Sequence, residues 1–382
     1  MQDKQYLLIP GPTPVPPTVV AAMSKPIIGH RGEEFAQLHK RVVEKLQKVF
    51  QTKNDIFVVT HSGTGALETA IANTVSPGDK VLSLITGNFG ERFANIARAY
   101  GAELIAVEFG WGNDVDLRVV EEKLKEHPDV KVVLATQNET STGVVNDIAG
   151  IGALVARTPA LLLVDGVSGV GAIEIKVDEW NVDILCVASQ KALMLPPGLA
   201  MVTASPKAWE VINKNKSPRF YFSMPAHRKS YEKLNTSYTP AVSLFYGLEA
   251  ALDMMLEERL PNVYARHALL ARATRAAIRA IGLKLLAEDR CASNALTAIW
   301  GPEGIGADEI RKVAKKHYGV AFAGGQGILK GKAMRIAHMG FCDKTDVLVA
   351  VGALEMALAQ LGYPVELGAG VRAAQEVFLG RA

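Results

Sequence analysis

The most constraining feature of this sequence is a series of short apolar runs between residues 55 and 203, separated by helical stretches. The runs are continuously apolar rather than alternating, which is typical of strands buried on both faces. Helices between successive strands indicate a mostly parallel central sheet covered by helices. Strands are predicted at 56–60, 80–85, 102–107, 130–136, 160–165, 184–188 and 199–203, with helices at 66–75, 91–100 and 117–126.

The rest of the chain is arranged before and after this sheet. Residues 7–14 are rich in proline and predict an extended arm, followed by a long amphipathic stretch at 33–50. The last third predicts helices at 241–257, 264–281, 307–317 and 344–361, and strands at 295–299 and 333–337. The predicted fold class is therefore α/β, with a smaller C-terminal α+β domain. The predicted domains are an N-terminal extended arm at 1–20, a large domain at 21–257 and a small domain at 258–382.

Composition excludes several classes of partner. The sequence has 42 Lys and Arg against 39 Asp and Glu, a formal net charge of +3, which argues against nucleic acid or an anionic membrane surface. Cys186, Cys291 and Cys342 are far apart, which fits a reducing compartment and predicts neither a disulfide framework nor a metal site. No run approaches the ~20 apolar residues of a membrane span, and residues 1–5 lack the apolar core of a signal peptide. We therefore expect a soluble, cytoplasmic protein.

One lysine stands where a predicted buried strand ends. Residues 184–188 are apolar, Ser189-Gln190-Lys191 follows, and Pro196-Pro197-Gly198 soon breaks the chain. Lys191 is either a surface residue at the start of a loop or a lysine held as an imine to a carbonyl cofactor. Asp165 ends another apolar run, and it either caps a turn or pairs with a protonated pyridine nitrogen. An aspartate and a lysine that open onto one crevice fit pyridoxal phosphate.

A second polar segment lies between a predicted strand and a predicted helix. His61-Ser62-Gly63-Thr64-Gly65 combines glycines that permit close approach with hydroxyls that donate hydrogen bonds. Together with a helix N-terminus, such a turn forms a phosphate cradle, although many strand–helix turns use Gly and Ser for geometry alone. No lysine follows as in a P-loop, and no GxGxxG occurs at a strand–helix turn. The sequence therefore favours neither a nucleotide triphosphatase nor a dinucleotide oxidoreductase.

Taken together, these motifs resemble those of the class V aminotransferases of fold type I, and specifically the alanine/serine–glyoxylate (serine–pyruvate) aminotransferase group. The resemblance covers nearly the whole chain, with the motifs in family order. The matching segments are 8–13, 29–31, 62–65, 88–92, 138–143, 165–168, 189–192, 196–198, 238–240 and 334–336.

The resemblance implies a pyridoxal 5'-phosphate enzyme whose Schiff-base lysine and proton carrier is Lys191. It implies that Asp165 binds the pyridine nitrogen, while Val167 and Phe89 pack on the two faces of the ring. Thr140 is then expected near the ring hydroxyl. The phosphate is expected to be held by Ser62, Gly63, Thr64 and Gln190, with Tyr238 or Thr239 added from the partner subunit.

The resemblance also implies how the substrate is bound. Arg335 is expected to bind the substrate carboxylate and Gly11 to line the substrate pocket. Arg335 alternates with apolar Met334 and Ile336, so it projects to the opposite face of its strand; from the residues alone it could equally be a solvated strand arginine. A guanidinium suits a carboxylate because its planar fork binds both oxygens. Contacts from a second subunit imply a homodimer with the active site at the subunit interface.

The expected reaction moves an amino group from alanine or serine to glyoxylate or pyruvate by a ping-pong mechanism through a lysine internal aldimine. The small amino-acid donor and the 2-oxo-acid acceptor are the expected partners. Aspartate, 2-aminoethylphosphonate and ureidoglycine are alternative donors on the same scaffold. A cysteine desulfurase is disfavoured, because the glycine-rich stretch 323–327 has no cysteine and Gln190 stands where those enzymes have histidine. Some relatives carry the label of a soluble-hydrogenase subunit, which would make this chain a non-enzymatic partner. The sequence does not support that alternative, because it has no cysteine pair to ligate nickel, iron or a cluster.

Overall fold

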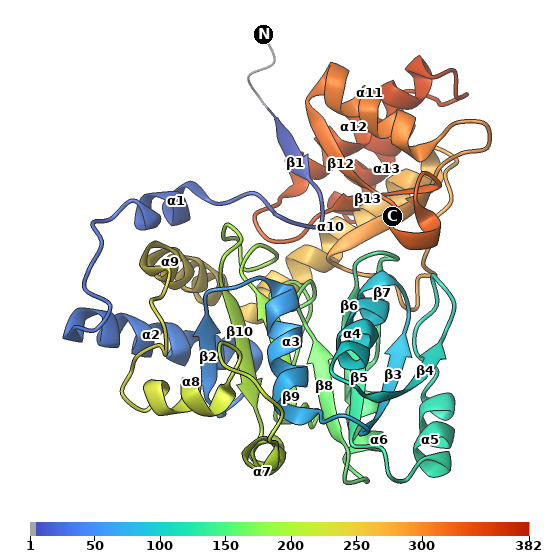
Figure 1. The fold of residues 1–382 in the computed structure, drawn as a ribbon. Helices are drawn as coiled ribbons and strands as arrows, with labels where there is room; N and C mark the ends of the chain where they lie inside the picture. Colours follow the sequence, from blue (N-terminus) through green and yellow to red (C-terminus); the bar gives the residue numbers. More distant parts are fainter. Residues whose placement is uncertain (1–4, 382) are drawn as a thin grey trace.

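The computed structural model describes residues 5–381, and a central sheet lies in the lower part of the view in Figure 1, with helices around it. Its seven strands lie in the order β2-β10-β9-β8-β5-β3-β4. Within the described residues, β10 is antiparallel to both neighbours and the other pairings are parallel. The fold class predicted from the sequence is therefore confirmed. The strand bounds are β2 Ile56–Val59, β3 Lys80–Ile85, β4 Glu103–Glu108, β5 Val132–Thr136, β8 Leu161–Asp165, β9 Ile184–Ala188 and β10 Ala200–Ala204.

Helices bury both faces of this sheet. One face packs on α2, α5, α6 and α9, where Phe35 and Phe245 are fully buried, with their ring centroids 5.2 Å apart. The other face packs on α3, α4 and α7, through side chains such as Phe93 and Trp209. The bounds are α1 Pro17–Met23, α2 Glu33–Phe50, α3 Gly63–Thr74, α4 Asn88–Ala99, α5 Leu117–Glu126, α6 Ile148–Val155, α7 Pro206–Lys214, α8 Met224–Tyr231 and α9 Val242–Glu258. A buried apolar surface on both sides explains why the strands read as continuous apolar runs.

A second sheet of four strands has the order β1-β12-β13-β11 and its own apolar core. Its strands are β1 Tyr6–Leu8, β11 Leu296–Trp300, β12 Val320–Gly324 and β13 Ala333–Ala337, with a 3₁₀ turn, η1, at Gly327–Leu329. The helices that pack on it are α10 Leu260–Ala280, α11 Ala307–Tyr318, α12 Lys344–Gln360 and α13 Ala369–Phe378. The division into domains near residue 257 stays a prediction.

The N-terminal arm is extended, as its prolines indicate, but it also forms a strand that sequence reasoning did not predict. β1 pairs in parallel with β12, with Tyr6 opposite Val320 and Leu8 opposite Phe322. Leu8 is buried in the core of the four-stranded sheet, and the following prolines lead the chain towards the central sheet (Figure 1). The arm therefore crosses from one sheet to the other.

Two further short strands, β6 Asn138–Glu139 and β7 Val144–Val145, form a hairpin directly after β5. Almost every residue from Thr136 to Asn146 is buried, although the segment is rich in Asn, Thr and Ser. Throughout the described residues, every helix is too short or too polar to cross a lipid bilayer.

Candidate active site

The predicted site residues gather where the parallel strands of the central sheet end. Asp165 is the last residue of β8, and Lys191 follows the last residue of β9, Ala188. The two strands are paired in parallel, with Asp165 opposite Cys186, so both residues lie at the same edge of the sheet. Ligands of such sheets bind beyond the carboxyl ends of the strands.

Lys191 is buried beneath the N-terminal arm. Its Nζ donates a hydrogen bond to the carbonyl of Pro10, and the Thr13 hydroxyl donates to the Lys191 carbonyl at 2.8 Å. A β-carbon on Gly11 would lie 2.6 Å from the Lys191 Nζ, and Gly11 has a φ of +129°, so glycine is required there. Burial lowers the pKa of Lys191 to about 8, and the nearby charge of Arg335 acts in the same direction. The structure therefore brings Gly11 and Lys191 together, while the lining of the substrate pocket by Gly11 stays a prediction.

Asp165 is also buried, with 4% of its surface exposed. Its Oδ1 accepts a hydrogen bond from the backbone N–H of Val167 at 2.9 Å. Burial raises the pKa of Asp165 to about 7, although the Val167 hydrogen bond and the charge of Lys191 oppose this rise. A buried carboxyl in this position accommodates a partner that carries a proton or a positive charge.

The segment expected to hold a phosphate caps helix α3. The Ser62 hydroxyl accepts from the backbone N–H of Gly65 at 3.3 Å, so Gly63-Thr64-Gly65 forms the first helical turn rather than a loop before the helix. The helix therefore begins earlier than the predicted residue 66, because a hydroxyl N-cap stabilises the extra turn. A β-carbon on Gly63 would lie 3.0 Å from the Val167 side chain, so this helix end packs directly on the segment after Asp165.

Gln190 supplies a further indication of a bound polar group. Its amide Oε1 is buried and has no hydrogen-bond partner in the described part of the chain. The same holds for Nε2 of His61, which follows β2, two strands away from β9 in the sheet. Buried polar atoms are normally paired, so such an atom indicates a missing ligand or water. The N-terminus of α3 favours an anion, and the Gln190 amide can rotate to donate to it. These features fit the phosphate of pyridoxal phosphate.

Phe89 lies in the first turn of α4, which begins at Asn88 rather than at the predicted residue 91. The reason is a buried acid that the sequence analysis missed. Oε2 of Glu139 accepts from the backbone N–H groups of Phe89 and Gly90, at 3.0 Å each, and so caps the helix from a separate strand. Glu139 is fully buried, and burial raises its pKa while these hydrogen bonds oppose the rise.

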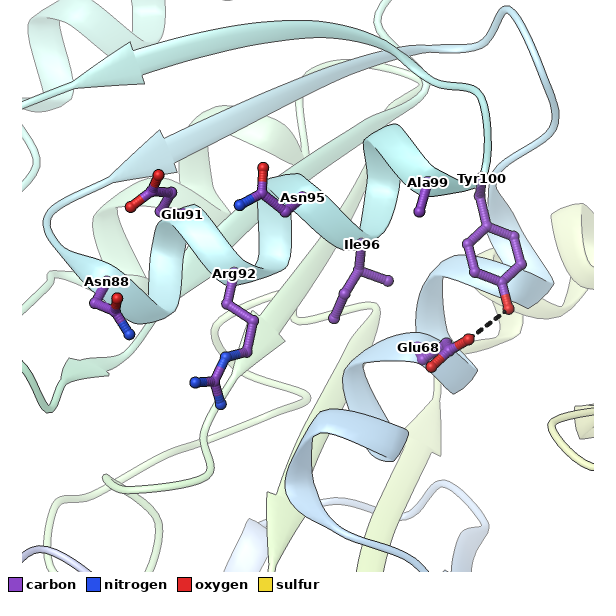
Figure 2. Close-up of a pocket in the computed structure, with 8 residues that line it drawn as sticks. All are labelled: Glu68, Asn88, Glu91, Arg92, Asn95, Ile96, Ala99 and Tyr100. Carbon is purple, nitrogen blue, oxygen red and sulfur yellow. Dashed lines mark hydrogen bonds between the residues drawn. The ribbon is translucent and has the colours of Figure 1, made fainter. Parts of the chain in front are cut away.

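Arg92 is a second residue that the sequence analysis did not single out, although it lies in a matching segment. Its guanidinium lies 4.7 Å from the centroid of the Phe89 ring, and its Nη1 lies 3.4 Å from the Thr64 hydroxyl. Arg92 lines a surface cavity of about 460 Å³ between α3 and α4. Figure 2 shows Arg92 near one end of α4 and Tyr100 at the other, where its hydroxyl donates to Glu68 at 3.0 Å. Arg92 therefore places a positive charge between the predicted ring and phosphate residues.

Arg335 reaches this region from the second sheet. It is 6% exposed, and its Nη1 donates to the Thr140 carbonyl at 3.0 Å. Its Nε and Nη2 donate to the Gly324 carbonyl at 3.0 and 2.7 Å, and Nη1 also donates to Gln326 Oε1 at 3.1 Å. Burial lowers the pKa of Arg335 to about 10, so the guanidinium stays charged at neutral pH. Its neighbours Met334 and Ile336 point into the core of the small sheet.

Thr140 lies beside these groups and is fixed by hydrogen bonds. Its hydroxyl donates to the Ser168 hydroxyl at 2.6 Å, which in turn donates to the Asn138 carbonyl at 2.8 Å. Ser168 follows Asp165 and Val167 in the chain, so Thr140 lies close to the segment expected to contact the cofactor ring.

Tyr238 and Thr239 have different surroundings. The Tyr238 hydroxyl donates to the Phe220 carbonyl at 3.1 Å, and its ring stacks on Tyr221 with centroids 4.9 Å apart. Tyr221 in turn donates to the carbonyl of Thr60, just after β2. The predicted contact of Tyr238 or Thr239 with the phosphate of a partner subunit stays a prediction.

This fold and site define the class of protein. A buried lysine and a buried aspartate lie at the carboxyl edge of a mostly parallel sheet, next to a capped helix end that suits a phosphate. These are the features of a pyridoxal-phosphate-dependent transferase.

Comparison with known proteins narrows the class. The family model for aminotransferase class-V matches residues 5–341, so the chain belongs to the class-V aminotransferases. It is 42% identical to the L-aspartate–glyoxylate aminotransferase of Paracoccus denitrificans, over 98% of this chain and 96% of the relative. It is 39% identical to the serine–glyoxylate aminotransferase of Arabidopsis thaliana, over 97% and 94%. The crystal structure of the ureidoglycine–glyoxylate aminotransferase of Bacillus subtilis superposes with a TM-score of 0.94 at 31% identity, covering 98% of each chain. The chain is therefore a transaminase that uses pyridoxal phosphate.

The raised pKa of Asp165 predicts that the stability of the cofactor-free protein depends on pH. The folded state keeps a proton on Asp165 up to about pH 7, whereas the unfolded chain releases it near pH 3.8. Because the folded state binds more protons in this window, the free energy of unfolding falls as pH rises, by about 1.4 kcal/mol per unit for this group. Asp165→Asn keeps an acceptor for the Val167 N–H but does not titrate, so it should remove this fall. Urea unfolding of the wild type and the variant between about pH 4 and 7 measures the free energy of unfolding at each pH. If this free energy fell equally with pH in both proteins, the raised pKa of Asp165 would be contradicted.

Proposed function

We propose that this transaminase moves the amino group of a small amino acid, alanine or serine, to glyoxylate. The observation that carries the proposal is that the charges of a buried carboxyl, Asp165, and of a buried guanidinium on the other sheet, Arg335, both act on Lys191. The names of the similar proteins support glyoxylate as the acceptor, since the two relatives and the solved structure all include it.

Bound pyridoxal phosphate supplies an electrophilic carbonyl and a ring that withdraws electrons from the bonds at the substrate Cα. The protein's part is to hold that ring and to move protons. Asp165 would hold the protonated ring nitrogen, and Phe89 and Val167 would pack on the two faces of the ring. Thr140 would contact the region of the ring hydroxyl. Ser62, Gly63, Thr64 and Gln190 would hold the phosphate.

Lys191 is the base that moves the proton at the substrate Cα. A lysine in water is protonated at neutral pH, with a pKa of about 10.4, and is therefore a poor base. Burial and the charge of Arg335 lower the pKa of Lys191 to about 8, so a larger fraction of its amine is neutral near neutral pH and can act as a base. The Pro10 carbonyl accepts from Nζ, and Gly11 packs directly on the Lys191 side chain, where a β-carbon would lie 2.6 Å from Nζ.

Arg335 orients the substrate through its carboxylate. The guanidinium is held in one plane by the Gly324 and Thr140 carbonyls, so its orientation is set before a substrate arrives. A fixed carboxylate presents the Cα–H bond to Lys191, which is the positioning that transamination needs. The donor and the acceptor both carry this carboxylate and use the site in turn, which gives ping-pong kinetics.

Aspartate is the second candidate donor. One relative at 42% identity is an L-aspartate–glyoxylate aminotransferase, and Arg92 is a cation near the predicted ring that could pair with a second carboxylate. Ureidoglycine is supported by one similar structure, and 2-aminoethylphosphonate would place a phosphonate at Arg335.

We further propose that the enzyme works in the cytoplasm, because its three free cysteines suit a reducing compartment.

Replacing Lys191 by alanine should abolish turnover, because the base at the substrate Cα is lost. Borohydride treatment of the wild-type holoenzyme should attach the cofactor covalently to the peptide that contains Lys191, as detected by mass spectrometry. The exposed Lys40, on α2, provides the matched control: Lys40→Ala should keep both turnover and labelling. Covalent label on another lysine, or normal turnover without Lys191, would overturn the assignment.

A screen of amino donors against glyoxylate tests the substrate class. Alanine or serine should give the highest kcat/KM, exceeding aspartate by about tenfold or more, because a second carboxylate is costly to bury without a dedicated partner. If aspartate is instead the best donor, Arg92→Gln should reduce kcat/KM for aspartate and leave the value for alanine nearly unchanged. That pair of results would replace the proposed donor with the second candidate.

We propose a homodimer whose contact surface includes the aromatic side chains around Tyr238. Phe220 is 79% exposed and packs against Tyr238, which is typical of an interaction surface. Sedimentation should give about twice the chain mass of 41.0 kDa. Phe220→Glu should shift the protein towards the monomer, whereas Leu367→Glu, at a position that is 61% exposed, should not. A monomeric wild-type protein would contradict this proposal.

A further inference from the structure

The guanidinium of Arg335 is already almost fully hydrogen-bonded within the protein. An arginine has five N–H donors. Within residues 5–381, one donor goes to Gly324 from Nε, one to Gly324 from Nη2, and two from Nη1, to Thr140 and Gln326. One Nη2 donor is left. A carboxylate bound through both oxygens needs two donors, so one of the existing partners must leave when it binds.

The existing partners differ in how easily they can leave. The Gly324 carbonyl belongs to β12, which pairs with β13, the strand of Arg335 itself. The Thr140 carbonyl belongs to a buried segment that is tied to Ser168. Only Gln326 uses a side chain with rotatable bonds. Its amide is the partner that a carboxylate can replace without moving the backbone.

The backbone around Gln326 is fixed, so the exchange is confined to the side chain. The Gln326 carbonyl accepts from the Leu329 N–H at 3.0 Å, and the Gly325 N–H donates to the Ala333 carbonyl at 2.7 Å. At Gly327, a β-carbon would lie 2.5 Å from the Trp111 ring, and its φ of +52° is left-handed. The backbone on both sides of Gln326 is thus held in close contact.

We propose that Gln326 sets the affinity of this site for carboxylates, because its amide competes with the substrate carboxylate for Arg335. In the absence of substrate, Gln326 accepts from the one Nη1 donor that the backbone carbonyls leave unpaired. When a carboxylate binds, its two oxygens take the free Nη2 donor and the Nη1 donor that Gln326 releases. This proposal rests on the proposed role of Arg335 as the carboxylate-binding residue.

The competition has a consequence for ligand selection. A neutral amide is a weaker acceptor for a guanidinium than a carboxylate is, so carboxylates displace Gln326 while neutral groups do not. The displaced hydrogen bond also lowers the affinity for every carboxylate by a similar factor. Gln326 therefore sets a common affinity for amino-acid donors and 2-oxo-acid acceptors, and it speeds the release of products from Arg335.

The experiment measures binding of glycolate to the holoenzyme by isothermal titration calorimetry. Glycolate has the carboxylate and the size of glyoxylate, but it has neither an amino nor an oxo group and so does not react. Gln326→Ala should lower the Kd of glycolate about three- to tenfold, because the competing hydrogen bond is removed. Gln326→Glu should raise the Kd by about tenfold or more, because a carboxylate at this position pairs with Arg335. Opposite shifts from two substitutions at one site distinguish competition from general damage.

A control variant and a steady-state measurement complete the test. Ile328 is 62% exposed in the same loop, so Ile328→Ala should leave the Kd of glycolate unchanged. In steady-state assays, Gln326→Ala should lower KM for the oxo acid without raising kcat. Unchanged or weaker glycolate binding by Gln326→Ala would overturn the proposal, since it would show that Gln326 is neutral or assists the carboxylate.

Arg335→Lys separates this proposal from the proposed function. A lysine cannot form the planar fork, so this variant should bind glycolate much more weakly. If Arg335→Lys weakens binding while the Gln326 variants equal the wild type, only the competition is refuted. If Arg335→Lys binds glycolate normally, the carboxylate role of Arg335 is refuted, and the role of Gln326 with it.

Discussion

Burying ionisable side chains is the constraint on which the rest of this site depends. Asp165, Arg335 and Glu139 are nearly inaccessible to solvent and Lys191 is half-buried, and removing a charge from water is unfavourable unless polar partners replace the lost hydration. Glu139 accepts hydrogen bonds from backbone N–H groups of α4, and Arg335 donates to backbone carbonyls of β12 and of the segment at Thr140. Asp165 and Lys191 have fewer polar partners, and their pKa values move towards neutrality. These two groups are the ones proposed to carry the proton chemistry.

The buried segment 138–141 links the parts of the site that come from distant regions of the chain. The Glu139 carboxylate fixes the helix turn that carries Phe89, and the Thr140 carbonyl fixes Arg335 of the second sheet. The Asn138 and Thr140 side chains both contact Ser168, close to Asp165. This explains why a loop full of polar residues is buried: its side chains replace water for the groups around it.

The sequence predicted those parts of the structure that depend on local pattern. Continuous apolar runs identified the strands of the central sheet, and a lysine and an aspartate at strand ends identified the edge where ligands bind. What it could not show depends on contacts between residues far apart in the chain. The predicted start of α4 was too late, because Glu139, which caps this helix, lies about fifty residues away in the chain. Without that cap, the glycines near Phe89 are typical of a loop. Pairing of β1 with β12, the charge of Arg92 over Phe89 and the contact of Gln326 with Arg335 have no local signature.

Arg335, the proposed carboxylate anchor, and Lys191 with Asp165, the proposed reacting centre, belong to different sheets. This separation helps to explain how one scaffold serves several donors. Arg335 lies on the four-stranded sheet and is proposed to bind the carboxylate that the amino and oxo acids share. Lys191 and Asp165 lie at the edge of the central sheet and are proposed to act on the cofactor and Cα. In this proposal, the part of the substrate that distinguishes alanine, serine and aspartate meets residues between these two groups. Because discrimination by a few such contacts changes binding by only about 1–3 kcal/mol each, a small number of substitutions around a constant anchor is enough to change the preferred donor.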